Sequence, residues 1–407
     1  MRLEILEERK AEDIAYGCTQ CGFCNANCPT GNELKWELGS PRGKIFFTRW
    51  LKEHGRNIPA EFVERIFECT MCGRCSTECQ ADLNTTSLWE AIRGEIGRRG
   101  LWPAGIKRLV ASIRRSKNIY GLPQEERLLW ADEFRDKIAP KINKPAKVAY
   151  FVGCVSSFSG RAASVAQAMF NILEAAKISY TVLGSEEWCS GTPLHFSGEG
   201  DTSIQLAEHN ASKFEGLGVD TVVTPCAGCY RALKKVYPEI VGPMSFKVLH
   251  SSEFIFQLIK EGKLKPGPQT EKRLAYHDPC LLGRHCNVYQ PPRDVLQKLP
   301  GLKIQEFLTS CDKAKCSGGG GNMRATYPEL TIDVGERLIH ESKQLGVETI
   351  ATACPTAKLT LMDAIERSKA QVQTVDLVEV VAKSLEAQPT PTAPSSTAAK
   401  PTQPQAK

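Results

Sequence analysis

The sequence predicts an α+β multidomain protein, in which a helical N-terminal domain is followed by two tandem α/β units. Two observations predict this class. Residues 1–100 carry two copies of one cysteine spacing, with helical periodicity between the copies. From residue 146 onward, strand-like segments alternate with helical ones, and the same pattern occurs twice. Such alternation is typical of parallel sheets covered by helices.

The composition is that of a globular protein that can form several domains. The chain has 407 residues, of which 42% are hydrophobic and 24% are charged. Its net charge of +6 is too small to indicate nucleic acid as a partner. The charged N-terminal segment MRLEILEERKAED has no apolar stretch typical of a secretory signal, and no run reaches the length of a membrane-spanning helix.

The 17 cysteines indicate metal binding rather than disulfides. Disulfides do not persist in reducing compartments, and no export signal is recognisable. We therefore expect a cytoplasmic protein without a direct membrane span, which can still associate with a membrane through a partner subunit.

Two cysteine runs in the first 100 residues have the spacing C-x2-C-x2-C-x3-C. They are Cys18, Cys21, Cys24 and Cys28, followed by Pro29, and Cys69, Cys72, Cys75 and Cys79, followed by Gln80. In such runs three cysteines hold one [4Fe–4S] cluster and the fourth usually ligates the other cluster. We therefore expect Cys18, Cys21, Cys24 and Cys79 to hold one cluster, and Cys69, Cys72, Cys75 and Cys28 to hold the other. The alternative is a pair of structural zinc sites.

The segments around these runs are predicted to be helical. Residues 41–55 and 60–68 have helical periodicity, and Pro41 suits a first helical turn. We assign residues 1–100 to a helical ferredoxin domain and residues 101–145 to a helical connector. Basic residues cluster between Arg93 and Lys117, and we interpret them as a solvated helix face; the alternative is a docking surface for an acidic redox partner. They are Arg98, Arg99, Lys107, Arg108, Arg114 and Arg115.

The α/β half divides into residues 146–268 and a second, degenerate unit at 269–387. Cys280, Cys316 and Cys354 lie 126, 127 and 128 residues after Cys154, Cys189 and Cys226, so the register between the units barely drifts. Each unit closes with a short predicted strand, at 246–250 and 372–376. Residues 388–407 lack the apolar content to form a core and are predicted to be disordered.

Four cysteines of the first unit are expected to converge on one site. Cys154 and Cys226 follow predicted strands, and ligands of open α/β sheets bind at the carboxyl ends of the strands. With Cys189 and Cys229 they provide four thiolates, enough for a third iron–sulfur cluster or for zinc. The further alternative is that they are buried thiols without metal.

The second unit offers only Cys280, Cys316 and Cys354, with Ala357 at the position of Cys229. Three ligands leave one position of a fourth cluster open, to be filled by a nearby side chain or by a substrate. The equally weighted alternative is a unit kept for its fold. The candidate side chains are Cys286, Cys311, His285 and Ser317.

Several other features are not assigned a catalytic role. No Gly-Lys-Ser/Thr follows Gly318–Gly321, so this run is not a nucleotide-binding loop. Its glycines are expected to let backbone amides approach a cluster sulfur, with a flexible surface loop as the alternative. We expect His195, His277 and His285 to be structural.

Together these motifs resemble a known family. CTQCGFCNANCPT, ECTMCGRCSTEC, PRGKI, WEAIRGEI and HDPCLLGRH are similar to iron–sulfur oxidoreductase subunits with an N-terminal ferredoxin domain and two cysteine-rich CCG domains. That family includes the D subunit of heterodisulfide reductase and the iron–sulfur subunit of glycolate oxidase. The resemblance implies a role in anaerobic metabolism. It also implies five cysteines in each intact CCG domain. Such a set binds a non-cubane iron–sulfur cluster at which disulfides are reduced. Here Ser190 and Ser317 interrupt the adjacent cysteine pair in both units.

The resulting hypothesis is an electron-transfer subunit of a heterodisulfide-reductase-like oxidoreductase complex. It would relay electrons between an acceptor and a flavoprotein or membrane cytochrome partner, because no flavin or nucleotide fingerprint is present. One alternative is a catalytic subunit that reduces a disulfide or similar two-electron substrate at a CCG-domain cluster. Another is a zinc-bound scaffold.

Overall fold

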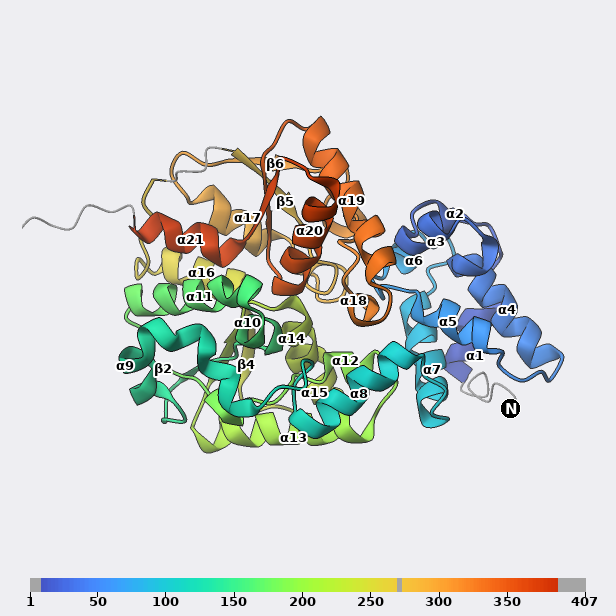
Figure 1. Ribbon diagram of the computed structural model, residues 1–407, viewed down its shortest axis with the longest axis horizontal. Coiled ribbons are helices and arrows are strands. Elements are labelled where there is room, and N and C mark those ends of the chain that lie inside the picture. Colours follow the sequence, from blue (N-terminus) through green and yellow to red (C-terminus); the bar gives the residue numbers. More distant parts are fainter. Residues whose placement is uncertain (1–8, 269–272, 387–407) are drawn as a thin grey trace, which may run out of the picture.

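The computed structural model describes residues 9–268 and 273–386 (Figure 1). The predicted disordered tail lies outside the described residues, as does the start of the second unit at residue 269. Within the described part of the chain, no helix combines the length and apolar character needed to cross a bilayer.

The N-terminal domain is helical, as predicted. Its helices are α1 (Arg9–Gly17), α2 (Phe23–Ala26), α3 (Pro29–Leu34), the 3₁₀ turn η2 (Glu37–Gly39), α4 (Pro41–Glu53), α5 (Ala60–Phe67), α6 (Arg74–Thr77) and α7 (Thr85–Arg98). The predicted helices at 41–55 and 60–68 are α4 and α5, each slightly shorter than expected. Helix α4 begins at Pro41 because the Ser40 hydroxyl accepts a hydrogen bond from the Gly43 amide at 3.1 Å.

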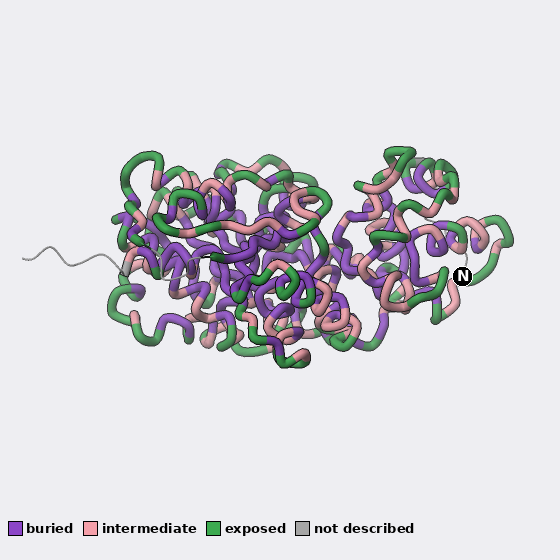
Figure 2. The backbone as a smooth tube through the Cα atoms, turned by 90° about the horizontal axis from the view of Figure 1, so that it is seen from above, coloured by how far each residue is buried: buried purple, intermediate pink, exposed green. Residues whose placement is uncertain are grey.

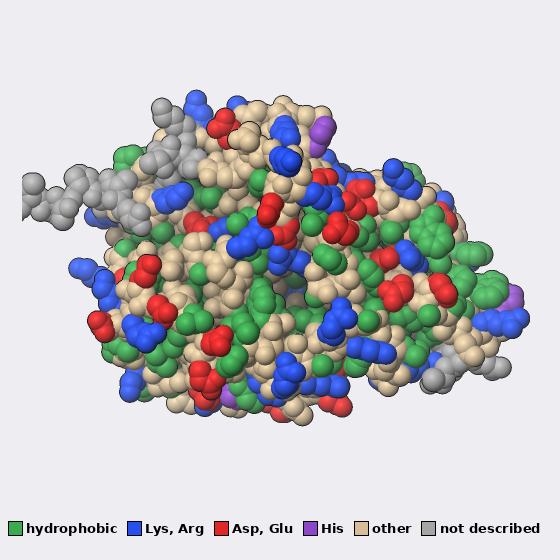
Figure 3. All heavy atoms as spheres, in the orientation of Figure 1, with side chains coloured by type: hydrophobic (Ala, Val, Ile, Leu, Met, Phe, Trp, Pro, Cys, Tyr) green, Lys and Arg blue, Asp and Glu red, His purple; other side chains and the backbone are tan. Residues whose placement is uncertain are grey.

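The connector is helical as well. It contains α8 (Ala104–Ser116), α9 (Arg135–Ile138) and two 3₁₀ segments, η3 (Gln124–Phe134) and η4 (Ala139–Lys141). Helix α8 buries an apolar face and exposes its basic residues, which are Lys107, Arg108, Arg114 and Arg115. Figure 3 shows Lys and Arg side chains interspersed with Asp and Glu over the face in view. Arg93, at the start of the basic stretch, does not belong to this solvated face, because it is completely buried.

Two four-stranded parallel sheets form the α/β half. The repeated pattern predicted two equivalent units with three of the four strands in each, whereas β2 and β6 were not predicted. The first contains β1 (Val148–Tyr150), β2 (Tyr180–Thr181), β3 (Thr221–Thr224) and β4 (Lys247–His250), in the order β2-β1-β3-β4. The second contains β5 (Arg273–His277), β6 (Lys303–Glu306), β7 (Thr349–Thr352) and β8 (Gln373–Asp376), in the equivalent order β6-β5-β7-β8. The shared order shows that the two units are structural repeats.

Helices cover both sheets. In the first unit they are α10 (Cys154–Phe158), α11 (Ala163–Ala175), α12 (Thr192–His195), α13 (Asp201–Gly216), α14 (Ala227–Arg231), α15 (Tyr237–Ile240) and α16 (Ser251–Lys260). In the second unit they are α17 (Gln290–Gln297), α18 (Met323–Thr326), α19 (Pro328–Gln344), α20 (Pro355–Ser368) and α21 (Leu377–Glu386).

The two units are joined by one continuous core. Helix α11 of the first unit packs against α21 of the second, and a single cluster of buried side chains includes residues of both units. Figure 2 shows buried chain running through the centre of this half, with the helical domain extending to one side. This shared core therefore fixes the position of the strand ends of one unit relative to those of the other.

Candidate metal centres

An outer cavity in the helical domain is lined by thiols from both cysteine runs. They are Cys18, Cys21, Cys24, Cys75 and Cys79. Cys21 is solvent-exposed, so this cavity lies close to the surface. Gly22 follows the second cysteine of its run and has φ +83°, and Gly73 has the same place in the second run with φ +76°. Because glycine adopts positive φ without strain, each run can turn into the short helix that carries its third cysteine.

An inner cavity is lined by Cys28, Cys69, Cys72 and Cys75. Cys75 therefore borders both cavities. Polar hydrogens point at the sulfurs: the Gly31 amide lies 3.3 Å from Cys28 Sγ, and the Thr85 hydroxyl lies 2.8 Å from Cys75 Sγ. Hydrogen bonds of this kind are typical of iron–sulfur ligands and tune the potential of the group that they hold.

Two of these thiols, Cys24 and Cys75, are harder to ionise than a free thiol. Burial raises the pKa of Cys75 to about 12, and burial together with neighbouring thiolates raises the pKa of Cys24 to about 12. A cationic centre reverses this effect by stabilising the thiolates. Within residues 9–268 and 273–386, no group of three or more Cys, His, Asp or Glu side chains converges closely enough to hold a single metal ion. The thiols instead surround small cavities, and this donor set fits iron–sulfur clusters.

Cys316 connects the helical domain to the second α/β unit. Its side chain is buried in one small cluster with Cys72 and Val334, and Cys280 packs against that cluster. The amide of Gly318 points at Cys316 Sγ from 3.4 Å. The thiols of two domains therefore meet directly.

The glycine run beside Cys316 is not a flexible surface loop, so that alternative is wrong. Gly318, Gly319 and Gly321 are buried. A Cβ at Gly320 would lie 2.5 Å from the Thr70 carbonyl oxygen, and one at Gly321 would lie 2.7 Å from the Thr70 carbonyl carbon. The glycines allow the backbone of the second unit to approach the loop between Cys69 and Cys72.

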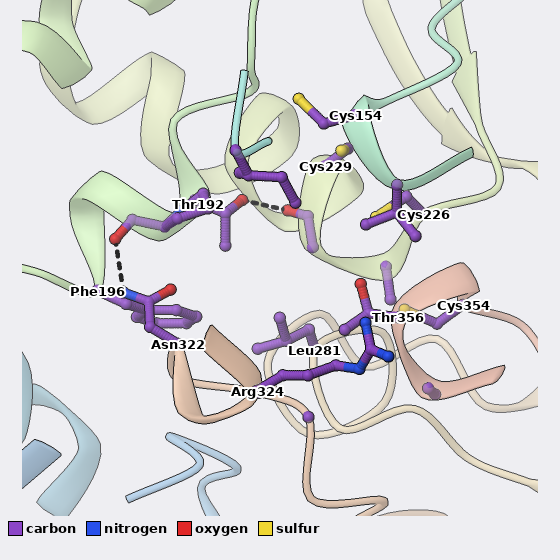
Figure 4. A pocket seen from close by; sticks show the side chains of 18 of the residues that line it. Cys154, Thr192, Phe196, Cys226, Cys229, Leu281, Asn322, Arg324, Cys354 and Thr356 are labelled. Carbon is purple, nitrogen blue, oxygen red and sulfur yellow. Dashed lines mark hydrogen bonds between the residues drawn. The ribbon is translucent and has the colours of Figure 1, made fainter. Parts of the chain in front are cut away.

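A third, much larger cavity of about 390 Å³ lies between the two α/β units (Figure 4). Six cysteines line it: Cys154, Cys189, Cys226 and Cys229 from the first unit, and Cys280 and Cys354 from the second. The two units therefore share one cavity, where the sequence predicted a separate site in each. Ser190 and Ser317 also line the cavity, and among its described lining residues Arg324 carries the only basic side chain.

The fold brings these cysteines together through the turns after its strands. Cys154 is the first residue of α10 and lies four residues after the end of β1, while Cys226 and Cys354 immediately precede α14 and α20. Figure 4 shows Cys226 and Cys354 approaching the cavity from opposite units. The Cys226 side chain interacts with both Cys229 and Cys354. Amides at helix N-termini favour thiolates, so this placement suits metal ligands.

Cys154 differs from the other thiols of the cavity. Its side chain interacts with Cys189, and the Arg127 guanidinium lies 3.5 Å from its sulfur. The hydrogen bond from Cys189 and the Arg127 charge lower the pKa of Cys154 below its usual value, even though Cys154 is buried. Arg127 also donates to Glu187 at 2.7 Å, and burial raises the pKa of Glu187 to about 7 against the opposing effect of Arg127.

The three histidines have structural partners. His277 interacts with the Thr352 hydroxyl at 3.0 Å and the Lys315 carbonyl at 3.2 Å. His285 contacts the Met71 carbonyl at 2.8 Å, and His195 lies 3.4 Å from Glu90. Of the candidates for a fourth ligand in the second unit, Ser317 lines the large cavity, whereas Cys286, Cys311 and His285 are not among its lining residues.

Sequence reasoning missed Arg93, which joins all three parts of the protein. Its guanidinium donates to the carbonyl oxygens of Cys69 at 2.8 Å, Phe196 at 3.0 Å and Gly321 at 3.0 Å. The position of Arg93 within the WEAIRGEI motif was the sequence feature that could have pointed to it. Arg127 and Glu187 were also missed. The position of Glu187 two residues before Cys189 was the only local indication of its role.

Comparison with known proteins agrees with this arrangement. Residues 14–83 match the 4Fe–4S dicluster domain family, and residues 148–234 and 274–362 each match the cysteine-rich domain family. The chain is 35% identical over 390 residues to the D subunit of dihydromethanophenazine:CoB–CoM heterodisulfide reductase from Methanosarcina acetivorans, covering 90% of this chain and 93% of that protein.

More distant relatives have other names. The B subunit of fumarate reductase (CoM/CoB) from Methanothermobacter marburgensis is 28% identical, over 90% of this chain and 71% of that protein. EtfAB:quinone oxidoreductase of Syntrophomonas wolfei is 30% identical, over 91% of this chain and 58% of that protein. The order of domains, the cysteine-lined cavities and these matches lead to one conclusion: the chain belongs to the family of iron–sulfur oxidoreductase subunits that includes the D subunit of heterodisulfide reductase.

Proposed function

We propose that this chain is the electron-transfer subunit of a heterodisulfide-reductase-like complex. It would bind two [4Fe–4S] clusters in residues 1–100, linked by the connector at 101–145 to a third cluster in residues 146–268. Residues 269–387 would complete the cavity. They would supply only some of the ligands of a fourth cluster. When bound, such clusters accept and release single electrons.

The observation that carries this proposal is the unbroken series of thiols between the exposed Cys21 and the large cavity. Cys75 borders both cavities of the helical domain. Cys72 packs with Cys316, against which Cys280 packs in turn, and Cys280 lines the large cavity. Each pair of neighbouring sites therefore shares a thiol or a contact between thiols. This is the arrangement that a relay requires.

In the proposed relay the ligand sets are interleaved between the two runs. Cys18, Cys21, Cys24 and Cys79 would hold the outer cluster, and Cys28, Cys69, Cys72 and Cys75 the inner one. The buried positions of Cys28 and Cys72 keep water from the inner site, while the exposed Cys21 gives a partner access to the outer site. Cys154, Cys189, Cys226 and Cys229 would hold the third cluster.

The proposal requires a redox partner, since no flavin or nucleotide fingerprint is present. Anaerobic affinity purification of the tagged chain from its native cells should recover a flavoprotein or cytochrome subunit in constant ratio. Recovery of the chain alone would contradict the complex. A colourless, zinc-loaded chain would instead favour a scaffold.

A second candidate function is reduction of a disulfide or similar two-electron substrate in the large cavity. The cavity volume and its six lining thiols favour this function. The serines Ser190 and Ser317 count against it, because the family resemblance implies a second cysteine at each of these positions. Reduction of a disulfide by the protein and a reduced dye, abolished by Cys189→Ala, would support catalysis. A protein that transfers electrons but reduces no disulfide would support the relay alone.

A further inference from the structure

Arg127 and Glu187 form a buried ion pair directly beside Cys154. Arg127 Nη1 lies 2.7 Å from Glu187 Oε1, and only 2% and 1% of the two side chains are exposed. The second terminal nitrogen, Nη2, lies 3.5 Å from Cys154 Sγ. One guanidinium therefore joins a carboxylate to a thiol inside the protein, where charges interact more strongly than in water.

The pair also fixes the loop that carries Cys154. Glu187 accepts hydrogen bonds from the amides of Val152 at 2.8 Å and Gly153 at 2.9 Å. Gly153 is the residue before Cys154 and has φ +79°, a conformation that an L-residue adopts only with strain. Arg127 therefore acts on the sulfur directly, while Glu187 holds the backbone that presents it.

Arg127 comes from outside both cysteine-rich segments. It lies in η3 of the connector, between the dicluster match that ends at residue 83 and the cysteine-rich match that begins at residue 148. Neither family description therefore covers this interaction with the cavity.

We propose that Arg127 is a positioning residue that raises the reduction potential of the cluster held by Cys154, and that Glu187 opposes it. This inference rests on the proposed third cluster. One-electron reduction adds one negative charge to the site, and a fixed positive charge beside a ligand sulfur stabilises that reduced form. The Glu187 carboxylate behind the guanidinium has the opposite effect when it is ionised, so the redox titration is carried out well above neutral pH.

The test is an anaerobic redox titration of the full chain, monitored by EPR. It is carried out on five proteins, and the iron content of each is measured. They are the wild type, Arg127→Gln, Arg127→Lys, Glu187→Gln and the double variant Arg127→Gln/Glu187→Gln. Arg135→Gln is added as the matched control, because Arg135 belongs to the same connector but is 75% exposed and pairs with Asp132 at 2.7 Å.

The expected shifts have opposite signs. Arg127→Gln should move the midpoint of the third transition to lower potential, and Glu187→Gln should move it to higher potential. The double variant should return towards the wild type, Arg127→Lys should shift less than Arg127→Gln, and Arg135→Gln should not shift. The two transitions of the helical domain should not change in any variant.

The outcomes separate this inference from the proposed function. A wild type with only two transitions and about eight irons would overturn this inference together with the proposed third cluster, and would leave a relay confined to the helical domain. A third transition that keeps its midpoint in the variants, or that shifts in the same direction for Arg127→Gln and Glu187→Gln, would overturn the role of Arg127 alone. If Arg127→Gln loses iron, the shifts in midpoint potential of Arg127→Lys and Glu187→Gln still test the predicted signs.

Discussion

The side chain of Cys72, in the helical domain, packs against that of Cys316, in the second α/β unit. The two residues are distant in the sequence, and Arg284 fastens the contact by donating from Nε to the Cys72 carbonyl at 2.7 Å. The second unit, which has fewer cysteines than the first at the equivalent positions, thus contacts a cysteine that lines the inner cavity. In the proposed relay, this contact places the second unit between the inner cavity and the large cavity.

Replacing Cys316 should interrupt that path without removing the clusters of the helical domain. Cys316→Ala should keep about eight irons in that domain but slow the oxidation of its reduced clusters by the cavity site, because the contact with Cys280 is lost. Freeze-quench EPR after rapid mixing measures this rate. Cys311→Ala is the control, since Cys311 lines none of the three cavities described. Equal rates in both variants would contradict the path.

The glycine run should not tolerate a side chain at its closest approach. Gly320→Ala would place Cβ 2.5 Å from the Thr70 carbonyl oxygen, so we expect a loss of roughly 1–3 kcal/mol in the free energy of unfolding and weaker retention of the inner cluster. Anaerobic denaturant titration with iron analysis checks this. Gly216→Ala has open space around its Cβ and should change stability by less than about 0.5 kcal/mol. Comparable losses in both variants would contradict a packed junction.

Arg93 should contribute to the docking of the helical domain. Arg93→Met leaves the carbonyls of Cys69, Phe196 and Gly321 without their charged donor, and the expected cost is about 3 kcal/mol or more. Calorimetry should then resolve separate unfolding of the helical domain and the α/β half. Arg98→Met, on the same helix but with a mostly exposed side chain, should leave one transition. A single unshifted transition in Arg93→Met would show that other contacts suffice.

His250 should make the protein less stable in mild acid. Burial lowers its pKa to about 4, below the usual value near 6.5. Below about pH 6.5 the unfolded chain therefore binds a proton that the folded chain does not, and folding loses up to about 1.4 kcal/mol per pH unit down to the folded pKa. Above this window the effect is absent.

The slope of unfolding free energy against pH between 6.5 and 5 measures this effect. Because glutamine does not titrate, His250→Gln should have a shallower slope than the wild type, by an amount approaching one proton. In the wild-type protein, the His250 ring interacts with the Ser252 hydroxyl at 2.9 Å and the Pro225 carbonyl at 3.2 Å. An unchanged slope would mean that His250 is protonated in the folded state.

Much of this architecture could be predicted from the spacing of one residue type. The repeated offsets of Cys154, Cys189 and Cys226 indicated two equivalent units, because a repeat conserves its register through every element. Strands β2 and β6 were not predicted. β2 has only two residues, and neither strand carries a cysteine that marks its end.

The contacts between units could not be predicted in the same way. Periodicity describes one element or one repeat, whereas the contact of Cys72 with Cys316 depends on how two folded parts pack. The same is true of Arg127, whose approach to Cys154 depends on the path of the connector. The spacing of the cysteines in the sequence identifies the candidate ligands. The packing between the domains determines which of these thiols lie in contact.

The measurement that tests the central claim most directly is iron and acid-labile sulfide per chain, combined with a redox titration by EPR, on anaerobically purified protein. A relay that continues into the large cavity predicts about twelve irons or more and a third redox transition that is lost in Cys154→Ala. About eight irons and only two transitions would contradict that claim and end the relay at the inner cavity of the helical domain.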